Sequence, residues 1–162
     1  MMKLRRKNLI WLAVVFSILT GAAAESPKNF RTHLSGSEQP VPVETRAQGQ
    51  AIFQLSADGM ALHYKLNVAN IEDVFMAHIH SAQPGENGPI VAWLYPATPP
   101  PVPIAGRFSG VLAAGVIQDN NLVGPLSGQT IQDLVDLIQD GGAYVNVHTA
   151  QFPAGEIRGQ ID

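Results

Sequence analysis

The chain has 162 residues, and 14% of them are charged, for a net charge of −3. This length gives room for one domain with a sizeable core, and the lack of a basic stripe argues against nucleic acid as a partner. No cysteine is present, which excludes thiolate metal ligands, disulfides and thiol catalysis.

The N-terminus has the pattern of an export signal. A basic start precedes an apolar run from Leu9 to Leu19, and the small residues Ala22–Ala24 follow. An uncleaved membrane anchor is the alternative, but the apolar run is short for a membrane span. We therefore expect residues 1–24 to be a cleaved signal peptide. Residues 25–162 would form a secreted or periplasmic protein with no membrane span.

From Gln48 onward, apolar and polar residues mostly alternate with a period of two, which is typical of strands. Two alternating runs at 51–55 and 62–68 flank Asp58-Gly59, and this arrangement predicts a β-hairpin. An irregular proline-rich loop is expected at 95–106. Further strands are expected at 76–80, 90–95, 107–112, 144–148 and 156–161.

One helix interrupts the strands. Thr130 is its expected N-cap, Asp133 follows three residues later in a capping-box arrangement, and apolar residues from 131 to 138 have helical spacing. Gly141-Gly142 marks its end. Many short strands and a single short helix predict an all-β Greek-key sandwich or barrel, superoxide-dismutase-like or immunoglobulin-like.

The last hairpin can be aligned in register from its apolar pattern. Valines occupy one face of its first strand, and Asn146 and His148 occupy the other. The parity that keeps valines away from charges places Asn146 opposite Arg158 and His148 opposite Glu156.

The same alternation places His78 and His80 on one face of their strand. Two histidines of this spacing, with His148 from another strand, are a common way to present three imidazoles to one ion. Glu156 is the candidate acceptor for an unused ring N–H. Hydrogen bonding within the protein is the alternative role for these histidines. A metal clamp requires His148 to lie within about 5 Å of both partners, because ligand bonds are near 2 Å.

Several motifs resemble the CHRD domain family, which is widespread in exported bacterial proteins. They are AHIH, NGP, GPL, AYVNVHT and GEIRGQI, within a stretch from Leu34 to Ile161. The resemblance implies a single β-rich domain. Six residues of this chain match positions in the family motifs. They are the three histidines His78, His80 and His148, and the supporting residues Asn146, Glu156 and Arg158.

The chain departs from the family at Gln39, where the aligned residue is usually glutamate followed by x-Pro-Pro-Val. A weaker likeness, at the level of fold, links the paired histidines to copper–zinc superoxide dismutase, in which such a pair binds copper outside the barrel. This chain lacks the dismutase cysteines and a second, bridged zinc site. A full dismutase site is therefore not expected.

We expect an exported domain that binds one metal ion, with copper first and zinc second, through the three histidines. The alternative is a non-catalytic structural or protein-interaction module at the cell surface or in the periplasm, with a protein partner. The sequence supports no reaction and no other cofactor: no serine lies in a nucleophile elbow, and the glycines form no phosphate-binding loop.

Overall fold

The structure is a computed structural model that describes residues 28–162, so the predicted signal peptide at 1–24 lies outside the described residues. Helix α1 (Ile131–Gln139) precedes the last two strands. The strands are β1 (Asn29–Ser35), β2 (Gln48–Leu55), β3 (Leu62–Ser81), β4 (Ile90–Tyr95), β5 (Ile104–Ile117), β6 (Ala143–Thr149) and β7 (Ile157–Gln160). Short 3-10 turns lie at Gly36–Glu38, Asp119–Asn121 and Gly124–Leu126. The prediction of an all-β fold with one short helix is confirmed.

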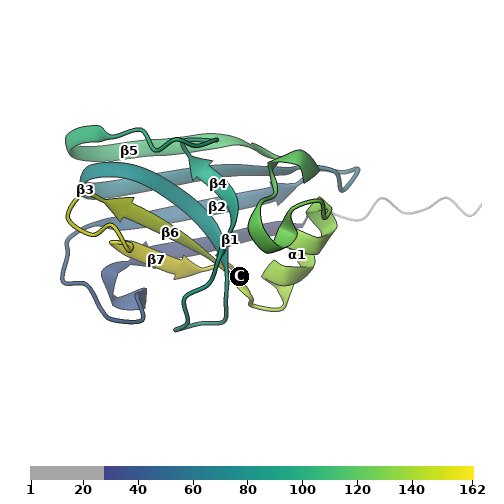
Figure 1. Ribbon diagram of the computed structural model, residues 1–162, viewed down its shortest axis with the longest axis horizontal. Helices are drawn as coiled ribbons and strands as arrows, with labels where there is room; N and C mark the ends of the chain where they lie inside the picture. Colours follow the sequence, from purple (N-terminus) through teal and green to yellow (C-terminus); the bar gives the residue numbers. More distant parts are fainter. Residues whose placement is uncertain (1–27) are drawn as a thin grey trace, which may run out of the picture.

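The strands close into a barrel around β3. Neighbouring strands run in the order β2-β1-β7-β6-β3, and a further pairing of β2 with β3 joins the two ends. On its other edge, β3 pairs with β5 along its first part and with β4 along its last part. Figure 1 shows β5 as the outlying strand at the top and α1 beside the right-hand ends of the strands.

Strand β3 is longer than the sequence indicated. Two separate strands were predicted at 62–68 and 76–80, whereas one strand of 20 residues spans both. Asn70 and Asp73 adopt left-handed backbone angles (φ 56° and 50°), and the pairing with β5 shifts register around them. Such bulges bend a strand without ending it, so polar residues that resembled a loop lie within β3.

Two other differences from the sequence prediction concern β1 and β5. β1 was not predicted, although its burial alternates strictly along NFRTHL. The strand predicted at 107–112 extends from Ile104 to Ile117, which shortens the predicted proline-rich loop. Both strands pair with neighbours far along the chain, β1 with β2 and β7, and β5 with β3.

The hydrophobic core fixes which side chains face outward. Ala77 and Ile79 of β3 and Val145 and Val147 of β6 are fully buried in the core. Because side chains alternate along a strand, the residues between them point to the outer face of the barrel. The histidines of β3 and β6 therefore lie on one outer surface, next to each other across the β3–β6 pairing.

Helix α1 forms as predicted. The Thr130 side chain accepts from the Asp133 N–H, and Asp133 accepts from the Thr130 N–H in return. Four apolar side chains of α1 are buried. Within the described part of the chain, no helix has the length and apolar character needed to cross a membrane.

Candidate metal centre

His78, His80 and His148 converge at one point. One ring nitrogen from each residue lies within 4.8 Å of those of the other two. The closest pair is His78 Nδ1 and His148 Nε2, which are 3.3 Å apart. In the β3–β6 ladder, His148 pairs with Met76, and His80 pairs with Tyr144. The predicted distance criterion for a metal clamp is met.

This outer face of the barrel is nevertheless buried. His78, His80 and His148 are 0%, 8% and 5% exposed. The Trp93 ring packs edge-on against His78 with centroids 4.2 Å apart, and loops 82–89 and 150–156 contribute hydrogen-bond partners to the cluster. The alternation of apolar and polar residues predicted that the histidines lie on the outer face of the barrel. It did not predict that loops bury this face, because alternation within a strand carries no information about the path of a loop.

Two backbone carbonyls fix the tautomers of two histidines. His80 Nδ1 is 2.9 Å from the Gly88 carbonyl oxygen, and His148 Nδ1 is 3.0 Å from that of Pro153. A carbonyl only accepts, so each Nδ1 carries the proton and donates it. The Nε2 atoms of His80 and His148 are therefore unprotonated and carry the lone pairs that metal ligation requires, and that of His148 faces His78 Nδ1.

The third imidazole completes a ligand set. Two ligands at about 2.0–2.1 Å from a tetrahedral ion are about 3.3–3.4 Å apart, and the His78–His148 separation is 3.3 Å. With His78 bound through Nδ1, the third ligand atom is His80 Nε2, which is buried and has no hydrogen-bond partner among the described residues. Buried polar atoms are normally paired, so this nitrogen fits a bound cation better than a purely structural role.

The surroundings keep all three imidazoles neutral. Burial, with a smaller contribution from the neighbouring His148 and His80, lowers the pKa of His78 to about 3. Burial also lowers the pKa of His148 to about 4 and lowers the pKa of His80. Imidazole binds metals in its neutral form, so the cluster is in the ligand form at neutral pH.

Glu156 does not accept the His148 ring N–H as predicted. Thr45 Oγ1 donates to Glu156 Oε1 at 2.6 Å, while Pro153 accepts the His148 N–H that Glu156 was expected to accept. The predicted register itself is correct, since Asn146 pairs with Arg158. The pairing ends at Val147 and Ile157, and the chain turns beyond this point. The turn places the Pro153 carbonyl within hydrogen-bond distance of His148 Nδ1.

Asn146 connects the site to the β1–β2 loop. It pairs with His78 across β3 and with Arg158 across β7. Its Oδ1 accepts from Gln39 Nε2 at 2.8 Å, and its Nδ2 donates to the Ala154 carbonyl at 3.1 Å. Gln39 is thus a buried neighbour of the site, although the sequence singled it out only as a departure from a family pattern.

Arg158 acts on the site through Tyr144. Its guanidinium lies 3.4 Å from the centroid of the Tyr144 ring, and that ring stacks on His80 with centroids 4.9 Å apart. Arg158 also donates to the carbonyls of Glu86 at 2.7 Å and Gln83 at 3.3 Å. It therefore anchors the same 82–89 loop that fixes the tautomer of His80.

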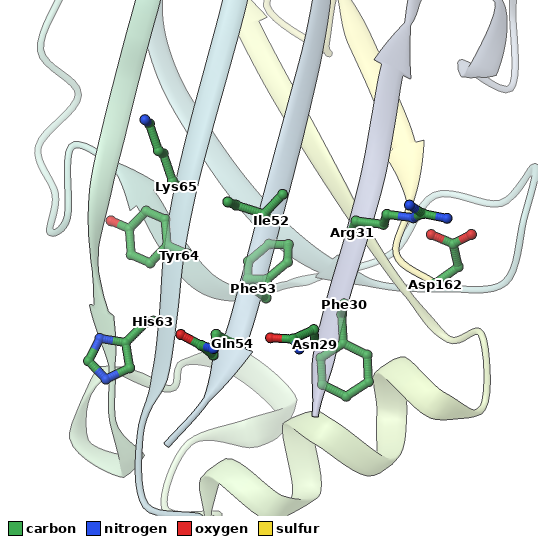
Figure 2. A pocket seen from close by; sticks show the side chains of 10 residues that line it. All are labelled: Asn29, Phe30, Arg31, Ile52, Phe53, Gln54, His63, Tyr64, Lys65 and Asp162. Atoms are coloured by element: carbon green, nitrogen blue, oxygen red, sulfur yellow. The ribbon is translucent and has the colours of Figure 1, made fainter. Parts of the chain in front are cut away.

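The remaining histidines lie elsewhere. His63 and His33 are exposed, and the surface position predicted for His63 is confirmed. Figure 2 shows His63, with Ile52 and Arg31, around a hollow of about 740 Å³ on the β1–β2–β3 part of the barrel. This hollow contains none of the predicted site residues.

Comparison with known families gives one result. A family model described as the CHRD domain matches residues 30–161, almost the whole described chain. Comparison with curated proteins and with solved structures found no match.

Proposed function

This chain belongs to the CHRD domain family, and we propose that it binds one transition-metal ion through His78, His80 and His148. The observation that carries the proposal is the convergence of three buried, neutral imidazoles at one point, where the Nε2 atom of His80 has no protein partner among the described residues. Copper is the preferred ion and zinc the second, because imidazole suits both and copper is the more tightly bound in the affinity order.

Metal analysis of the mature chain, purified without an affinity tag, is the direct test. We expect about one copper or zinc ion per chain as purified, since the three ligands converge on one point. After chelator treatment, calorimetry should return the same stoichiometry. A metal-free protein that takes up neither ion would overturn the proposal.

Two substitutions at His148 test whether the ion is bound by the three histidines. His148→Ala should abolish binding, and His148→Asn should do so while keeping a donor near the Pro153 carbonyl. His63→Ala is the matched control because His63 is exposed and outside the cluster. Unchanged binding in both His148 variants would show that the ion sits elsewhere.

A non-catalytic interaction module is the second candidate. It is favoured by the bonds from His80 and His148 to loop carbonyls, which hold loops in place without any ion. Under this reading, a bound protein partner would be retained after chelation and after His148→Asn. Loss of the partner with the metal would favour the metal-binding role.

We also propose that the domain acts outside the cytoplasm after removal of residues 1–24, as the basic and apolar pattern of the N-terminus supports. N-terminal sequencing of the protein expressed from the full chain in a bacterium is the test. A first residue at Glu25 is expected, and a retained Met1 would contradict cleavage.

A further inference from the structure

We infer that the three-histidine site selects monovalent copper, Cu(I), over Cu(II), and that Gln39 and Arg158 set this selectivity through charge. The inference rests on the proposed metal-binding function and goes beyond it by specifying the charge of the bound ion. It follows from the ligand set, the burial of the site and the charged groups nearby.

The ligands themselves carry no charge. The histidine cluster includes no carboxylate among the described residues, and the whole sequence offers no thiolate. Glu156, the acidic residue predicted to support the site, makes its hydrogen bond to Thr45 instead. A dication held by three neutral imidazoles would therefore keep its full double charge within the protein.

Burial makes that charge costly. His78 is fully buried, and aromatic rings of Trp93 and Tyr144 pack against His78 and His80. The cost of moving an ion from water to a medium of low dielectric rises with the square of its charge. A dication thus costs about four times as much as a monocation of similar size, and the ligand set carries no negative charge to compensate for the difference.

Arg158 adds a second positive charge near the site. It is 1% exposed and is connected to His80 through the stacked ring of Tyr144. No carboxylate lies within the 4.0 Å ion-pair distance of its guanidinium in the described chain, and Glu38 acts on it only from farther away. Its hydrogen-bond acceptors are neutral groups of the 82–89 loop, such as the Glu86 carbonyl. Its positive potential opposes a dication more than a monocation.

Gln39 keeps the neighbouring position neutral. Its amide is buried and donates to Asn146, the residue paired with both His78 and Arg158. A glutamate of almost the same shape would place a negative charge there. The charge of this one side chain is therefore the simplest way to change the preference of the site without changing its ligands.

The test compares affinities for Cu(I) and Cu(II) by competition with chromophoric chelators, the Cu(I) series under anaerobic conditions. The mature chain is compared with Gln39→Glu, Arg158→Met and the control Gln50→Glu, which makes the same charge change on an exposed position of β2. Thermal unfolding of each metal-free variant checks the fold, and Gln39→Glu alone suffices if Arg158→Met does not fold.

We expect the mature chain to bind Cu(I) at least tenfold more tightly than Cu(II). Gln39→Glu should shift the ratio of the two affinities toward Cu(II) by on the order of tenfold, because one added negative charge near the site attracts a dication more strongly than a monocation. Arg158→Met should shift it the same way, and Gln50→Glu should not shift it.

Equal or tighter binding of Cu(II) by the mature chain would overturn the inference while leaving the metal-binding function in place. An unchanged ratio in Gln39→Glu would overturn the role of charge at that position. Failure to bind copper in either oxidation state, or zinc, would instead overturn the proposed function itself.

Discussion

Lowering the pH should unfold the metal-free domain through its buried histidines. In the folded state the pKa of His78 is about 3 and that of His148 about 4, whereas an unfolded chain has a histidine pKa near 6.5. Below about pH 6.5 the unfolded chain therefore binds more protons than the folded one. The stability of the fold falls as the pH falls through this window, and it is fully present above it.

The size of the effect follows from the same values. At about pH 4.5, protonation favours the unfolded chain by about 2.7 kcal/mol per histidine, or about 5 kcal/mol for His78 and His148 together. Such a loss is a large part of the 5–15 kcal/mol that stabilises a typical domain.

Urea unfolding of the chelator-treated protein at several pH values between about 7.5 and 4.5 gives the measurement. The carboxyl groups of Asp58 and Asp133 do not interfere, because their hydrogen bonds hold each pKa below 3.8. His148→Asn should flatten the dependence, since it removes one of the groups that take up a proton. A free energy of unfolding that stays constant across this range, or an equal slope in the variant, would refute the reasoning.

Three further substitutions probe the helix, the core and the hydrogen bond to the Gly88 carbonyl that fixes the tautomer of His80. Thr130→Ala removes the hydrogen bond that the Thr130 side chain accepts at the start of α1 and should cost about 1 kcal/mol in urea unfolding. Ile79→Ala empties a fully buried core position and should cost roughly 2–5 kcal/mol while the metal stoichiometry is unchanged. Gly88→Ala would place a Cβ 1.7 Å from the Ser81 carbonyl oxygen, so the loop must shift. Displacing the acceptor of His80 should lower metal affinity about 10–100-fold, and calorimetry would show whether it does.

The sequence was sufficient where a local pattern determines the structure. The Asp58-Gly59 turn, the Thr130 cap and the Asn146–Arg158 register each depend on residues close together in the chain, and each formed as predicted. The convergence of the histidines was also predictable, because alternation and the family motif placed them on one outer surface. The unpredicted extent of β3 depends on two left-handed residues, Asn70 and Asp73, whose conformation no periodicity reveals.

The covering of the site could not be derived in the same way. The acceptors for His80 and His148 are backbone carbonyls, which every residue carries, so no side-chain pattern marks Gly88 or Pro153. The prediction that Glu156 accepts the His148 N–H was wrong for a related reason. A threonine from the distant β1–β2 loop takes the carboxylate, and the path of that loop is set by tertiary packing.

The interior position of strand β3 limits how a bound ion can exchange with solvent. It pairs with β6 and β4 around His78 and His80, so these residues lie in the interior of a hydrogen-bonded ladder. Interior strands open to hydrogen exchange only with large-scale unfolding. The β-strands that carry the histidines are thus among the slowest parts of the molecule to open. Fast entry or release of an ion must therefore occur by motion of the 82–89 and 150–156 loops, and the rate of metal exchange should respond to changes in those loops long before it responds to changes in the core.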